Sequence, residues 1–168
     1  MAHPVAPGPE ILSLDVPSLF KPQPRAILRA AKQILKECRE ELESKGEEIG
    51  EVEVGIMVET PAATIRAQNI APEVAFFSIG TNDLVQYTLA ADRGNERLTR
   101  LQSADHPAVL DLIEKTCEAA REAGLWVGVR SESAGEPEMI PKLIKLGVTE
   151  LSMSARSIPR AKKIVSEL

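Results

Sequence analysis

The sequence is poor in cysteine and histidine, with two residues of each type among 168. Cys38 and Cys117 lie far apart, and neither has a second cysteine or a histidine at the spacing of a metal site. Free cysteine behaves as a small apolar side chain, so both are expected to be buried or half-buried structural thiols. His3 falls in a predicted tail and His106 precedes a proline at a predicted helix start, so neither histidine is expected to be catalytic.

Long apolar runs and clusters of positive charge are absent as well. No run approaches the roughly 18 residues needed to cross a bilayer, so a membrane span is not expected. The first residues have no basic segment followed by an apolar one, which argues against a secretory signal and predicts a cytoplasmic location. The formal net charge is −5 and the basic residues are scattered, so nucleic acid is not an expected partner.

Proline concentrates at the start of the chain, where six of the twelve prolines fall in residues 1–24. Proline fixes φ and lacks an N–H, so a long regular element is improbable there. We therefore interpret residues 1–24 as a proline-rich, irregular arm. Residues 25–168 would form one domain, since single domains usually contain roughly 50 to 250 residues.

The segment 25–45 has apolar residues at intervals of three and four, with charged residues between them. This spacing predicts an amphipathic helix, which Gly46 would end. The apolar positions are Ile27, Leu28, Ala31, Ile34, Leu35, Cys38 and Leu42.

Four short β-rich runs follow, each succeeded by a turn and a helical stretch. The predicted strands are 52–59, 74–80, 125–132 and 150–153. Such apolar strands suit a covered parallel sheet, and their alternation with helices predicts an α/β architecture. Four units are half of an eight-unit (β/α)8 barrel of the TIM type, whose closure takes roughly 250 residues. The predicted fold is therefore a half-barrel of about four parallel βα units, preceded by the amphipathic helix.

Polar side chains gather where the predicted strands end, which is the edge at which α/β barrels carry out their chemistry. Glu59 ends one strand, and Asn82 and Asp83 follow the next. Two neighbouring carboxylates suit Mg²⁺, a hard ion that prefers oxygen ligands. Arg93 lies in the loop beyond, and its planar guanidinium can hold a phosphate. On spacing alone, a helix cap or a surface ion pair is the preferred reading of these residues, and the metal and phosphate readings are the alternative.

Several long runs between residues 52 and 168 are distinctive. They are GIMVETPA at 55–62, FFSIGTNDL at 76–84, QYTLAADRGN at 86–95, HPAVL at 106–110 and LSMS at 151–154. These runs resemble the C-terminal phosphoenolpyruvate-binding (β/α)-barrel of the bacterial phosphoenolpyruvate-protein phosphotransferases, Enzyme I of the sugar phosphotransferase system. Phosphoenolpyruvate synthases and pyruvate phosphate dikinases carry a related signature, but GTND followed by QYT favours Enzyme I.

The resemblance implies a barrel that binds phosphoenolpyruvate and Mg²⁺ and passes the phosphoryl group to a histidine on another domain. At the matching positions, Glu59 and Asp83 would be the Mg²⁺ ligands. Asn82 and Arg93 would hold the substrate phosphate. The resemblance covers the second half of the family's barrel only.

Three departures from the family matter for activity. The first half of its barrel, with several arginines that grip phosphoenolpyruvate, has no counterpart in the sequence, and neither has its phosphohistidine domain. One strand of the family is skipped after Ala30, where the chain joins directly to the next helix. Arg130 stands where the family has a cysteine that protonates the enolate carbon. Arginine stays protonated near neutral pH and cannot donate its proton usefully, so no intact catalytic residue is expected.

Three functions remain open at this point. The chain can be a phosphotransferase subunit that borrows the missing groups from another chain, or a phosphoenolpyruvate- and Mg²⁺-binding module that is inactive alone. It can also be an excised or engineered half-barrel with a structural, self-associating role. A half-barrel leaves two open sheet edges and an apolar inner surface, so a homo-oligomer, in the simplest case a homodimer, is expected.

Overall fold

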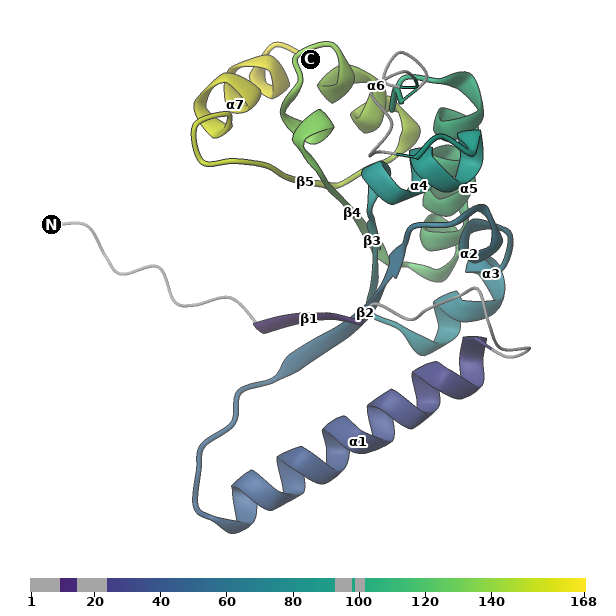
Figure 1. Cartoon of the computed structure of the whole chain (residues 1–168). Helices are drawn as coiled ribbons and strands as arrows, with labels where there is room; N and C mark the ends of the chain where they lie inside the picture. The colour runs from purple at the N-terminus through teal and green to yellow at the C-terminus, as the bar shows by residue number, and fades with distance from the viewer. Residues whose placement is uncertain (1–9, 15–23, 93–97, 99–101) are drawn as a thin grey trace, which may run out of the picture.

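The computed structural model describes residues 10–14, 24–92, 98 and 102–168, and its centre is a parallel sheet in the order β1-β2-β3-β4-β5 (Figure 1). Neighbours in the sheet are also neighbours in the sequence, as in the wall of a (β/α)-barrel. Within the described residues the sheet does not close, which leaves β1 and β5 as its edges. The predicted α/β half-barrel is confirmed, with one strand more than expected. The strands are Glu10–Leu14 (β1), Val52–Val58 (β2), Phe76–Ile79 (β3), Trp126–Arg130 (β4) and Glu150–Ser152 (β5).

Helices follow the strands, and α2 to α5 lie together on one side of the sheet (Figure 1). The longest of these, α5, begins and ends where the sequence predicts. His106 is its N-cap, and the imidazole Nδ1 accepts a hydrogen bond from the Ala108 N–H at 3.2 Å. Gly124 follows it with φ of 71°, a left-handed conformation that glycine adopts without strain. The helices are Pro24–Ser44 (α1), Pro61–Ile65 (α2), Ala67–Ile70 (α3), Thr81–Leu89 (α4), Pro107–Ala123 (α5), Met139–Leu146 (α6) and Ile158–Ser166 (α7), with single 3₁₀ turns at Ala71–Glu73 (η1) and Glu132–Gly135 (η3).

Strand β1 lies inside the segment that the prolines led us to interpret as an irregular arm. It pairs with β2 in parallel, with Glu10 opposite Val52 and Leu14 opposite Ile56. The interpretation is wrong for Glu10–Leu14. The prolines of this segment all lie before residue 10 or after residue 16, so the five residues between them keep every N–H that a sheet requires. As predicted, α1 runs unbroken past Ala30, with no strand between it and β2.

The core lies between the sheet and the helices. Two rows of apolar side chains cross β2, β3 and β4, and every member is at most 5% exposed. The rows are Ile56, Phe77 and Val127, and Val58, Ile79 and Val129. Cys117 of α5 is buried in the same core, and this burial raises the pKa of its thiol to about 12. The expected structural role of Cys117 fits its surroundings.

On the opposite face of the sheet, two aromatic rings stack. The centroids of Phe76 and Trp126 lie 4.2 Å apart, with 12° between the ring planes. The indole N–H of Trp126 donates a hydrogen bond of 3.2 Å to Glu53. The Phe76 ring covers Gly55, where an added Cβ would lie inside the 3.0 Å limit of real contacts. The face that would point into a barrel is therefore partly filled by the chain itself.

Helix α1 extends away from the rest of the molecule (Figure 1). Leu28 is 1% exposed, but further along the same stripe Ile34 is 59% exposed and Leu42 is 44% exposed. Cys38 is exposed as well, so its predicted burial is wrong. The periodicity of α1 identified an apolar stripe correctly, but only the first part of that stripe packs against the body.

The beginning of α1 is held by one carboxylate on η1. Glu73 accepts hydrogen bonds from the guanidinium of Arg29 at 2.9 Å and also from Arg25. The hydrogen bond from Arg29 holds the pKa of Glu73 below its usual range. The ammonium group of Lys32 contacts the backbone carbonyl of Glu73.

Among the described residues, no helix has the length and apolar character needed to cross a membrane.

Candidate functional site

The ends of β2, β3 and β4 meet at one edge of the sheet because the strands are parallel and in register. Val58, Ile79 and Val129 lie side by side across the three strands. The next residues along the chain are Glu59, Gly80 and Arg130, so the register brings these to one edge. The sequence prediction that polar residues gather at this edge agrees with the observed arrangement.

Glu59 lies across the end of the neighbouring strand. A Cβ added to Gly80 would be 2.5 Å from the Glu59 Oε1 atom and 2.8 Å from its Cγ, so any larger residue at position 80 would displace the Glu59 side chain from this place. Glu59 does not cap the following helix. That role belongs to Thr60, whose hydroxyl accepts a hydrogen bond of 3.1 Å from the Ala63 N–H. The helix-cap reading of Glu59 is therefore excluded for α2.

Asn82 and Asp83 lie in the first turn of α4, the helix that begins directly after Gly80. Asp83 is half-buried, and a carboxylate at the start of a helix is favoured by the helix dipole. Asn82 is exposed. Glu59 and Asp83 thus come from adjacent strand ends and approach the same edge, although each also makes another interaction within the chain.

The donor set at this edge suits Mg²⁺ better than a metal that needs several protein ligands. No group of three or more histidine, cysteine, aspartate or glutamate side chains is placed to hold a metal in the part of the chain that the structure describes. Mg²⁺ commonly takes only one or two carboxylates and completes its shell with water and substrate phosphate. A pair of carboxylates such as Glu59 and Asp83 would meet this requirement.

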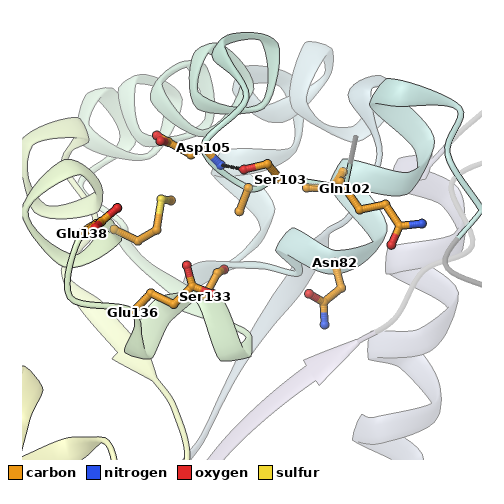
Figure 2. A pocket seen from close by; sticks show the side chains of 10 residues that line it. Asn82, Gln102, Ser103, Asp105, Ser133, Glu136 and Glu138 are labelled. Carbon is orange, nitrogen blue, oxygen red and sulfur yellow. Dashed lines mark hydrogen bonds between the residues drawn. The ribbon is translucent and has the colours of Figure 1, made fainter. Parts of the chain in front are cut away.

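A cavity of about 360 Å³ opens beside Asn82, between α4, residues 102–105, η3 and the start of α6 (Figure 2). Figure 2 shows Ser103 and Asp105 along one side of the opening and Ser133 and Glu136 along the other. Three of its lining residues are carboxylates, and one of them, Asp105, is paired with Lys142 at 2.6 Å. The lining is Asn82, Val85, Gln102, Ser103, Ala104, Asp105, Ser133, Glu136, Glu138 and Met139.

A second cavity of about 390 Å³ lies at the ends of β4 and β5. Arg130 and Ser152 are opposite each other in the register of these strands, and both line it. Among the described residues, none lines both cavities. The turn η3 supplies Ser133 to the first cavity, and its N-cap Ser131 to the second.

Of the residues predicted from the sequence, Glu59, Asn82, Asp83 and Arg130 come to this edge of the sheet. Arg93 lies outside the described residues. The structure separates Asn82 and Arg130 into different cavities, which no linear spacing indicates. Sequence reasoning also missed Gly80, although a glycine directly after a strand and before a helix start is a visible sign that another group lies close to the backbone.

The family model and the curated relatives that match this chain point to the same protein family. Residues 26–168 match the family model described as PEP-utilising enzyme, PEP-binding domain. The phosphoenolpyruvate-protein phosphotransferase of Staphylococcus carnosus (strain TM300) is 42% identical over 179 residues, and that of Geobacillus stearothermophilus is 44% identical over the same length. Each alignment covers 94% of this chain and 31% of the relative, so the chain spans about a third of the length of these proteins.

Among solved structures, similarity is more distant. A HpcH/Hpal aldolase/citrate lyase family protein from Burkholderia cenocepacia J2315 superposes with a TM-score of 0.48 and 21% identity, over 70% of this chain and 42% of that one. Macrophomate synthase gives a TM-score of 0.44 and 19% identity, and the match covers 70% of this chain and 38% of the synthase chain.

Proposed function

The chain belongs to the family of PEP-utilising enzymes by its PEP-binding domain, and we propose that it is a phosphoenolpyruvate- and Mg²⁺-binding unit that does not transfer phosphoryl groups by itself. In this proposal Glu59 and Asp83 bind Mg²⁺. Asn82 and Arg93 contact the substrate phosphate. The ion would supply positive charge next to that phosphate.

One observation carries the proposal. The Glu59 carboxylate lies close to the backbone of Gly80 at the end of β3, and Asp83 lies in the first turn of α4, which follows. This placement depends on β2, β3 and α4 alone. The binding of the ion therefore needs nothing from the other two thirds of the relatives' length, whereas the binding of the whole substrate does.

Mg²⁺ should bind weakly and phosphoenolpyruvate should bind only in its presence. Titration of each ligand, followed by protein NMR chemical shifts, measures this directly. Glu59→Gln should abolish the Mg²⁺-dependent shifts, because it removes one of two carboxylates. Arg130→Ala should tighten Mg²⁺ binding by no more than severalfold, since Arg130 is exposed to water, which screens its charge, and it lines the other cavity.

Glu51→Gln is a matched control, because Glu51 is an exposed carboxylate just before the opposite end of β2. It should leave every shift unchanged. If Glu59→Gln binds Mg²⁺ as the parent does, and Arg130→Ala binds it no more tightly, the two carboxylates are structural and the proposed site is wrong.

A second candidate function is that of a self-associating half-barrel. Within the described residues, β1 and β5 each lack a partner on one side, and the end of the α1 stripe is exposed. Unpaired parallel edges and apolar stripes both favour association with another chain. A two-fold axis along the barrel axis would place β5 of one copy beside β1 of the other, with all strands still parallel.

The chain should therefore not behave as a monomer at micromolar concentration. Sedimentation at several concentrations should show a species of about twice the 18.2 kDa mass of the chain. Ile34→Glu, on the exposed stripe, should shift the equilibrium toward monomer if α1 takes part. A concentration-independent species of 18.2 kDa that unfolds cooperatively would contradict this function while leaving the ligand site untouched.

A further inference from the structure

We propose that Arg130 and the serine hydroxyl groups around it form a binding site for a phosphate group, distinct from Asn82 and the two carboxylates. The site is the cavity of about 390 Å³ at the ends of β4 and β5. Among the residues whose side chains the structure describes, its lining is one arginine, four serines and one methionine. The lining residues are Arg130, Ser131, Ser152, Met153, Ser154 and Ser157.

The charge of the site comes from Arg130. Its side chain is exposed, and it forms no salt bridge with any residue that the structure describes. A guanidinium group offers several N–H donors in one plane, a geometry that matches two oxygens of a phosphate. Within the described part of the chain, no ion pair has to be broken before this guanidinium binds an anion.

The serine hydroxyls are held in place on both sides of Arg130. The Oγ atoms of Ser154 and Ser157 are 3.1 Å apart, and those of Ser131 and Ser133 are 2.6 Å apart. The Ser131 hydroxyl also accepts a bond from a backbone N–H of η3. A hydroxyl has one donor and two acceptor positions, so each pair orients its members and leaves further hydrogen-bonding capacity for a ligand.

The start of α7 also favours anion binding in this cavity, but more weakly than Arg130 does. Its N-cap Ser157 makes no side-chain bond to the first turn, so the N–H groups there are not capped by a side chain. Pro159 has no N–H, which limits the number of free donors. The partial positive charge of a helix start favours an anion nearby.

The carboxylate of Glu150 opposes anion binding at the site. The Glu150 side chain lies against Gly128, two residues before Arg130 on the same face of β4. Two residues along a strand correspond to roughly 7 Å, so this negative charge weakens anion binding without forming an ion pair. The cavity volume is in the range of small-ligand pockets and accommodates more than a bare phosphate. The expected ligand is inorganic phosphate or a small phosphate monoester.

This inference goes beyond the proposed function because Asn82 lines the other cavity and no metal is involved. Inorganic phosphate should therefore bind to the full chain with a chelator present and Mg²⁺ absent. The measurement is a titration followed by ¹H–¹⁵N shifts, including the side-chain Nε–H of Arg130. The expected result is saturable shifts confined to Arg130, Ser131 and the start of α7. Glycerol phosphate, run in parallel, distinguishes a monoester from free phosphate as the preferred ligand.

Variants separate the possible outcomes. Arg130→Gln should weaken phosphate binding at least tenfold, Arg130→Lys should retain part of it, and Glu150→Gln should tighten it several-fold. Arg121→Gln, an exposed arginine at the end of α5, is the control that should change nothing. Unchanged binding in Arg130→Gln would refute the proposal.

The phosphate site and the proposed Mg²⁺ site can fail independently. Loss of phosphate binding in Asn82→Ala, with binding retained in Arg130→Gln, would place the phosphate at the other cavity and refute this site alone. Retained phosphate binding without any Mg²⁺-dependent shift would instead support this site and contradict the proposed function.

Discussion

Replacing Gly55 with alanine should destabilise the chain by about 3 kcal/mol, at the upper end of the cost of overpacking a core. The added Cβ would fall inside 3.0 Å of three atoms of the Phe76 ring. That ring cannot move away easily, because Trp126 stacks on it at 4.2 Å and is itself tied to Glu53 by a hydrogen bond. Denaturant unfolding followed by circular dichroism measures the change in the free energy of unfolding.

Gly50→Ala is the matched control. Nothing lies within 4 Å of a Cβ built at Gly50, so the same change there should be neutral or slightly stabilising, by less than about 1 kcal/mol. Phe76→Leu in the Gly55→Ala background should recover part of the lost stability, since leucine has no ring atoms at the place that the new Cβ occupies. Equal stability of the two single variants would show that the aromatic pair is free to shift, and that the inner face is loosely packed.

Most of the fold can be predicted from the sequence because its signals are local. Pro107 and Gly124 bound α5 by the usual preferences for proline at a helix start and glycine just past its end, and the apolar runs marked β2 to β5 within a few residues. Strand β1 was missed because its evidence is not local. Five residues between prolines become a strand only through pairing with β2, which lies about 40 residues further along the chain.

The exposure of Cys38 shows a different limit. Periodicity locates the apolar stripe of α1 but says nothing of what covers it. Leu28 packs against the body and Ile34 does not, although both belong to the same stripe. Tertiary contacts decide between them, and one carboxylate, Glu73, holds the start of the helix in place.

The sequence could predict that Glu59, Asp83 and Arg130 reach one edge of the sheet, but not how the cavities at that edge are divided. The rule that parallel strands end at one edge was enough to bring Glu59 and Asp83 together. It could not separate Asn82 and Arg130 into two cavities, since that division depends on the path of η3. The serines around Arg130 are common residues without a diagnostic spacing, and only the fold reveals that they surround one cation.

No pyruvate should be released from phosphoenolpyruvate by this chain, with or without a histidine-bearing acceptor protein. Proton donation by a positioned acid typically contributes roughly 10²- to 10⁴-fold to a rate, and the resemblance would place Arg130 at the position of the family cysteine that supplies this proton. A coupled pyruvate assay with Mg²⁺ present measures turnover. Asp83→Ala, run beside the parent, shows whether any signal depends on the proposed site.

Restoring the cysteine should not restore the reaction. Arg130→Cys returns a group that can carry a proton, but the resemblance places several substrate-gripping arginines in a part of the relatives that this sequence does not span. Without them the substrate is not held in line for transfer, and the loss of positioning can outweigh the gain of the acid by several powers of ten. Turnover in Arg130→Cys that disappears on Asp83→Ala would show that one residue alone silences the site. Turnover in the parent chain with the same dependence would show that this third of the relatives' length already contains a working active site.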